Sequence, residues 1–175
     1  MKSRFFALLS APALAHSTLQ DTQAQAGSTY KGVLRVPHGC GEQATHTVRI
    51  QMPEGIYGVK PMSKPGWNLE TVKGRYAQPY TSHGTVTTEG VREIVWSGGH
   101  LPGEWYDEFV FRGSLGADLK PGTVLHFPAV QECADATADW TDTSGDAGVK
   151  NPAPRVTIIA PAAAPVASPA APHHH

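Results

Sequence analysis

The sequence predicts an all-β domain, a β-sandwich of about eight strands, and three observations support this. The 175 residues include 18 Gly and 15 Pro, and only 17% of the residues are charged. This composition disfavours long helices and coiled coils. No segment repeats its apolar residues with the 3.6-residue period of a helix. Instead, short β-branched and aromatic runs alternate with turn signals at the spacing typical of a sandwich.

The expected strands are short runs bounded by Gly and Pro. They lie near residues 30–36, 45–52, 67–73, 84–88, 92–97, 107–112, 123–130 and 155–160. In the second run Val48, Ile50 and Met52 alternate with polar residues, which is the pattern of a half-buried strand. Between the runs, Gly and Pro supply the backbone conformations that turns require. These turns are expected at 53–55, 64–66, 98–99, 101–103 and 120–122.

Residues 1–15 predict a secretory signal peptide. Lys2 and Arg4 precede an apolar stretch, and Ala13-Leu14-Ala15 matches a cleavage site. The stretch is too short for a membrane span, which needs about 20 apolar residues. The alternative to a signal peptide is therefore a strand of the core. Cleavage would place the protein in the periplasm or outside the cell, with His16 as its first residue.

The two cysteines and the C-terminal tail fit an exported chain. Cys40 and Cys133 are an even pair, which predicts a disulfide in an oxidising compartment, and the alternative is that they bind a metal as thiolates. The folded domain is expected to span 16–160. Residues 161–175 are rich in Pro and Ala, predict a disordered tail, and end in three histidines that are either native or a cloning remnant.

The charge balance excludes several partners. Lys and Arg total 14 against 15 Asp and Glu, and no cluster of basic residues occurs. Nucleic acids and anionic membranes are bound mainly through positive charge, so neither is an expected partner. The prolines of the tail also argue against a C-terminal membrane anchor.

A chain that begins at His16 carries two nitrogen donors on one residue, the α-amine and the imidazole Nδ1. Both can lose a proton to a divalent ion and close on it as a chelate. Amine, imidazole and carboxylate together form a tetragonal N,N,O ligand set, which suits Cu(II). Zn(II) prefers a tetrahedron, and Cu(I) would need soft sulfur ligands.

Several ordered motifs resemble the YcnI-like copper-binding domain family, over roughly residues 16–160. The resemblance begins with His16 directly after the Ala-x-Ala site and ends with Trp140. The other motifs are Leu-Arg-Val-Pro-His-Gly-Cys (34–40), Met-Pro-Glu-Gly (52–55), Val-Lys-Pro (59–61), Pro-Gly-Trp (65–67), Ile-Val-Trp-Ser-Gly-Gly (94–99), Asp-Glu-Phe-Val-Phe-Arg-Gly (107–113) and Phe-Pro-Ala-Val-Gln-Glu-Cys (127–133).

The resemblance implies an immunoglobulin-like or cupredoxin-like sandwich that binds Cu(II) through an N-terminal brace with one histidine. His16 would supply the amine and Nδ1, Glu42 the carboxylate, and Trp140 would lie beside the metal. Glu54 and Glu132 remain alternatives for the carboxylate. The other internal histidines, among them His38 and His46 on either side of Glu42, are expected to be ordinary solvated or hydrogen-bonded residues.

The expected function is therefore extracytoplasmic copper buffering, trafficking or delivery to another copper-handling protein, without catalytic turnover. Two alternatives belong to other classes. A histidine-brace copper oxidase or monooxygenase would need a second imidazole at the metal. An adhesion or carbohydrate-binding sandwich would present exposed, coplanar tryptophans, whereas Trp67 and Trp96 are expected in the core.

Overall fold

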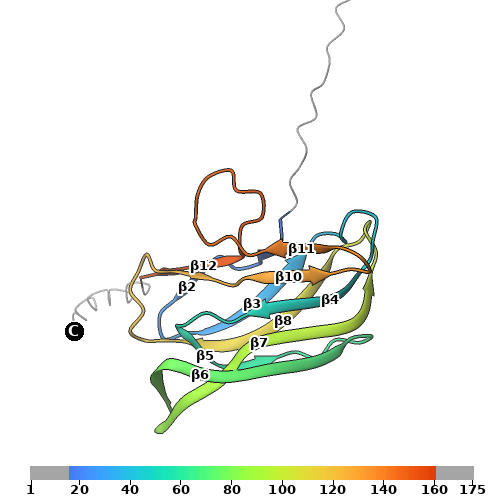
Figure 1. Ribbon diagram of the computed structural model, residues 1–175. Helices are drawn as coiled ribbons and strands as arrows, with labels where there is room; N and C mark the ends of the chain where they lie inside the picture. Colours follow the sequence, from blue (N-terminus) through green and yellow to red (C-terminus); the bar gives the residue numbers. More distant parts are fainter. Residues whose placement is uncertain (1–15, 161–175) are drawn as a thin grey trace, which may run out of the picture.

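The computed structural model describes residues 16–160, and these residues form twelve strands and no helix (Figure 1). The predicted signal peptide and tail lie outside the described residues. The strands are β1 (Thr18–Leu19), β2 (Gln23–Gln25), β3 (Thr29–Val36), β4 (Thr45–Gln51), β5 (Ile56–Pro61), β6 (Asn68–Ser82), β7 (Thr85–Leu101), β8 (Asp107–Leu115), β9 (Val124–His126), β10 (Ala129–Glu132), β11 (Thr137–Trp140) and β12 (Arg155–Ile159).

Two large sheets and one small sheet build the domain. The first has the order β1-β3-β8-β5, the second β11-β10-β4-β7-β6, and the third β2-β12-β9. All neighbours are antiparallel except β2 and β12, which run parallel. β6 and β7 form a long hairpin that extends beyond the rest of the sandwich, and β6 is the outer edge of its sheet (Figure 1).

One hydrophobic core joins the three sheets. Its largest side chains are fully buried: Trp96 from β7, Phe109 and Phe111 from β8, and Phe127 between β9 and β10. The indole Nε1 of Trp96 donates to the carbonyl of Met62 at 3.1 Å, so its one polar group is satisfied despite burial. Gly32 lies under the Phe111 ring, where an added Cβ would come within 2.2 Å of Cζ.

The predicted fold class is confirmed. Val48, Ile50 and Met52 are buried on one face, as the alternating pattern of this run predicts. Trp96 lies in the core as predicted. Trp67 is only partly buried, but it packs against that core with its ring edge-on to Phe109, at 4.9 Å between ring centroids.

The expected strand count was too low, because several strands carry no periodic pattern. The prediction missed the short strands β1, β2 and β11 and also β5, which contains Gly58 and ends in Pro61. The two predicted runs at 84–88 and 92–97 form one continuous strand, β7. The predicted run at 123–130 is divided into β9 and β10 around Pro128, which has no N–H to donate to a strand ladder.

The glycines at 98–99 form a β-bulge and not the expected turn. β4 and β7 pair at Thr45 with Leu101 and at Thr47 with Ser97, so the single residue His46 lies opposite Gly98, Gly99 and His100. Gly98 has a φ of 71°, and a Cβ on Gly99 would come within 2.0 Å of the Trp67 ring. Both positions therefore require glycine, for the left-handed backbone and for the close approach respectively.

The predicted disulfide is present between Cys40 and Cys133, with 6.2 Å between their Cα atoms. It joins the loop that follows β3 to the residue after β10. Because both cysteines are bonded to each other, the alternative of a thiolate metal site is wrong.

Candidate functional site

His16 and Trp140, two residues named from the sequence, lie side by side at one end of the sandwich. Their ring centroids are 5.9 Å apart, with the rings inclined at 63° in an edge-on arrangement. His16 is half-buried and Trp140 is 6% exposed. The Nε2 atom of His16 is buried and has no hydrogen-bond partner among residues 16–160. An unpartnered buried polar atom is costly. A brace would use the other ring nitrogen of His16, Nδ1.

A buried amide fixes the Trp140 indole. The Nε1–H of Trp140 donates to Oε1 of Gln131 at 2.6 Å. Nε2 of Gln131 donates in turn to the carbonyl of His38 at 2.8 Å and to Oγ1 of Thr45 at 3.0 Å. Gln131 is 1% exposed, so this network holds the orientation of Trp140 from inside the domain.

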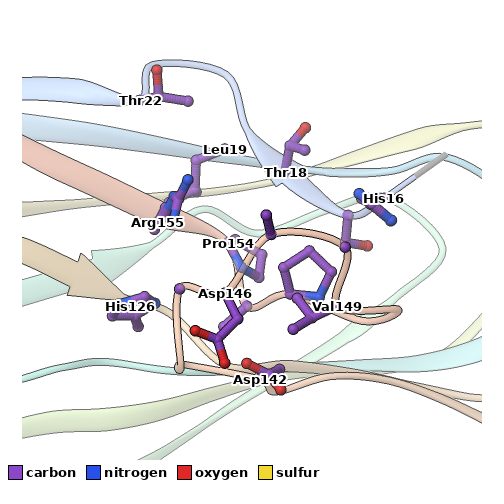
Figure 2. Close-up of a pocket in the computed structure, with 16 residues that line it drawn as sticks. His16, Thr18, Leu19, Thr22, His126, Asp142, Asp146, Val149, Pro154 and Arg155 are labelled. Carbon is purple, nitrogen blue, oxygen red and sulfur yellow. The ribbon is translucent and has the colours of Figure 1, made fainter. Parts of the chain in front are cut away.

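His16 lines the rim of a pocket with a volume of about 480 Å³. The segment that enters β1 forms one side, and the loop at 141–154, between β11 and β12, forms much of the other (Figure 2). His126, at the end of β9, lies on the opposite side of the pocket from His16, and Asp142 and Asp146 lie in the loop (Figure 2). The pocket thus collects imidazole and carboxylate groups from three separate parts of the chain.

The loop is held in shape around Asp142. Its Oδ1 accepts hydrogen bonds from the N–H of Ser144 at 2.9 Å and from the Ser144 hydroxyl at 2.6 Å. These bonds lower the pKa of the Asp142 carboxyl, with a smaller contribution from the charge of His126. The backbone of Asp142 also bonds to Asn151 and Ala153, which closes the base of the loop. Asp142 is therefore an ionised carboxylate at neutral pH.

His126 is a site residue that the sequence did not indicate. Its Nδ1 is buried without a hydrogen-bond partner in the described part of the chain. Burial lowers the pKa of His126 and the positive charge of Arg155 lowers it further, while Asp142 acts in the opposite direction. The ring therefore favours the neutral form, which is the form that binds metals. No local motif marks His126. It reaches the pocket only because the 141–154 loop folds beside the end of β9, and the sequence does not show this proximity.

The predicted carboxylate lies elsewhere. Glu42 is exposed and lines a different pocket, with Gly41, Gly103 and Glu104. Of its two alternatives, Glu54 forms an ion pair with Arg92 at 2.8 Å, and Glu132 forms one with Arg49. The structure therefore brings His16 together with Trp140, but it does not place Glu42, Glu54 or Glu132 in the pocket that His16 lines.

Within residues 16–160, no three side chains of His, Cys, Asp or Glu are grouped closely enough to hold a metal ion. A brace needs fewer side chains, because the N-terminal residue would supply two nitrogen donors. Such a brace would still need one carboxylate beside His16 to complete the N,N,O set that suits Cu(II). The same described residues also contain no helix long and apolar enough to cross a membrane.

Comparison with known proteins places the fold and the family. An uncharacterised protein from Nocardia farcinica, whose crystal structure has an immunoglobulin-like fold, matches with a TM-score of 0.60 and 21% sequence identity. The match covers 84% of this chain and 99% of that one, so the protein is an immunoglobulin-like β-sandwich. Residues 16–158 match the model of the domain of unknown function DUF1775. The chain belongs to this family, which is the YcnI-like family that its motifs resemble. No curated protein matches the chain.

Proposed function

We propose that this protein is an extracytoplasmic Cu(II)-binding protein that buffers the ion or passes it to another copper-handling protein. In this proposal His16 becomes the first residue after export, and its α-amine and Nδ1 hold Cu(II). Trp140 lies beside the ion and limits its access to solvent. The observation that carries the proposal is the contact between the His16 and Trp140 rings, with centroids 5.9 Å apart, at the rim of a pocket that contains carboxylates.

The third donor in this proposal is the carboxylate of Asp142. It lines the same pocket as His16, and both of its hydrogen bonds to Ser144 are accepted by Oδ1. Its lowered pKa keeps it ionised where copper is bound, so it adds a negative charge and an oxygen donor. Glu42 remains the carboxylate implied by the family resemblance.

The brace is tested by placing one Gly before His16. This addition moves the free amine away from the imidazole and leaves every side chain intact. We expect strong loss of Cu(II) affinity, measured by titration followed through tryptophan fluorescence and by EPR. A chain with one Gly added after His175 is the matched control. Equal affinity of the two extended chains would refute the brace. Mass analysis of the exported protein checks that it begins at His16.

A copper oxidase is the second candidate. It would need a second imidazole at the metal, and His126 lines the same pocket, on the side opposite His16 (Figure 2). Such an enzyme would turn over oxygen with a reductant, whereas a buffer or carrier would not. Adding ascorbate and oxygen to the copper-loaded protein separates the two, since peroxide above the level produced by free copper would favour the enzyme. An adhesion or carbohydrate-binding role has less support, because it would present several exposed tryptophans. Trp96 and Trp140 are buried and Trp67 packs against the core, so Trp105 alone of the four is strongly exposed.

A further inference from the structure

The bulge between β4 and β7 brings two surface histidines together. His46 is the single residue of β4 opposite Gly98, Gly99 and His100 of β7. The rings of His46 and His100 are 5.5 Å apart between centroids and inclined at 45°. Both residues are exposed, while Gly99 between them is buried. Neither residue belongs to the pocket that His16 lines, so this pair is a separate feature of the molecule.

The backbone of the bulge also sets the tautomer of the neutral His46 ring. Its Nδ1 lies 2.9 Å from the carbonyl oxygen of Gly99. A carbonyl can only accept, so Nδ1 carries the hydrogen and donates it. In the neutral ring Nε2 then has a free lone pair. This is the arrangement in which metal-binding histidines are usually held, with one ring nitrogen donating to a carbonyl or carboxylate and the other facing the ion.

The spacing of the rings fits a shared ion. A ring nitrogen binds a divalent transition ion at about 2.0 Å, so two rings that share the ion have centroids roughly 4 to 6 Å apart. The observed 5.5 Å lies within this range. Because both side chains are at the surface, water can supply the remaining ligands.

We infer that His46 and His100 form a second metal site, which chelates a divalent first-row transition ion through two imidazoles. Two nitrogen donors with water suit Cu(II), Ni(II) and Zn(II), and the order of stability places Cu(II) first. The bulge brings the two histidines together. It places three residues of β7, Gly98 to His100, opposite His46, where regular pairing would place one. This site is independent of the N-terminal brace and requires neither export nor a free amine.

The test uses the full chain with H16A, H173A, H174A and H175A, which removes the proposed brace and the terminal histidines. We expect this protein to bind Cu(II), with modulation from two imidazole nitrogens in pulsed EPR. Adding either His46→Ala or His100→Ala should weaken binding, measured by calorimetric titration, by more than about tenfold. Each substitution should also remove one imidazole from the EPR signal. His83→Asn, at an exposed histidine of the β6–β7 turn, is the matched control and should change nothing.

A double variant makes the test sharper. A chelate loses most of its affinity with the first histidine, so the double variant H46A/H100A should bind Cu(II) little more weakly than either single variant. Losses that add across the two substitutions would show two separate weak ligands and overturn the inference. The same holds if H46A and H100A match H83N. Unchanged thermal unfolding of all four variants (H46A, H100A, H46A/H100A and H83N) ensures that a loss of copper reflects the site and not the fold.

Discussion

Gln131 accepts a 2.6 Å hydrogen bond from the indole of Trp140 and connects it to the loop that carries the disulfide. The same side chain donates to the carbonyl of His38, two residues before Cys40. The aromatic ring that lies against His16 is therefore positioned by the buried interior and not by the surface loop above it. The candidate site consequently has one fixed wall, formed by Trp140, and one wall formed by the 141–154 loop.

Replacing Gln131 with Leu should lower the free energy of unfolding by about 1–3 kcal/mol, because the buried indole N–H and the Thr45 hydroxyl would lose their partner. Urea unfolding followed by circular dichroism measures this change. The control is Gln78→Leu, which removes an exposed hydrogen bond to Asp118 and should change the free energy by less than about 0.5 kcal/mol. Equal effects of the two substitutions would contradict the role given to Gln131.

The carboxylate at the copper site can be identified by three isosteric substitutions. We expect Asp142→Asn to weaken Cu(II) binding by the exported protein, while Glu42→Gln leaves it unchanged. The amide introduced at position 142 can still accept the hydrogen bonds from Ser144 through its oxygen, so the loop should keep its shape. Asp146→Asn is the matched control from the same loop. Copper titrations decide, and a larger effect of E42Q than of D142N would restore the carboxylate implied by the family.

Loss of the disulfide should strongly destabilise the domain. Cys40 and Cys133 are separated by 93 residues, and the loop-entropy model gives about 4–5 kcal/mol for a loop of this length. The double substitution C40S/C133S should lower the midpoint of guanidinium unfolding accordingly. Dithiothreitol should shift the midpoint of the wild-type chain toward that of the double variant and leave the variant unaffected. A wild-type midpoint insensitive to reduction would contradict the expectation.

Stability should decrease as the pH falls below about 6.5, in part because of His126. Its pKa is lowered in the folded protein, first by burial and then by Arg155. The unfolded chain therefore binds a proton at a higher pH than the folded one, and protonation favours unfolding as the pH falls between the two pKa values. His126→Gln should make the dependence on pH shallower between about pH 7 and 5, measured by urea unfolding. His83→Asn should preserve the wild-type slope.

The sequence predicted the elements whose burial follows a simple period. β4 is an example, because Val48 and Ile50 alternate with polar residues and are fully buried. The β6–β7 hairpin was harder to predict, because in its far half most residues apart from the buried Tyr76 and Tyr80 are exposed, and the half carries no such alternation. Gly98 is compatible with a turn as well as a bulge, because both use glycine at positive φ, and only the pairing with β4 distinguishes them.

Only part of the candidate site could be predicted, because some of its residues come together only through the fold. His16 and Trp140 were named from ordered motifs, and the structure places them in contact. His126 was expected to be an ordinary histidine and Asp142 was not named, because only the path of the 141–154 loop brings them to the same pocket. The same limit applies to His46 and His100, which are far apart in the sequence and meet only through the register of β4 with β7.

The long outer margin of β6 has a consequence for how copies of this protein meet. Lys73, Arg75 and Pro79 lie along it, and its pairing with β7 is interrupted between Arg75 and Tyr80. A second molecule that approaches this edge meets positive charge, the missing N–H of Pro79 and an irregular backbone. These features disfavour pairing between two edge strands, which a straight row of free N–H and C=O groups would favour. The most extended part of the molecule is thus protected against fibre-like stacking, even in a crowded compartment.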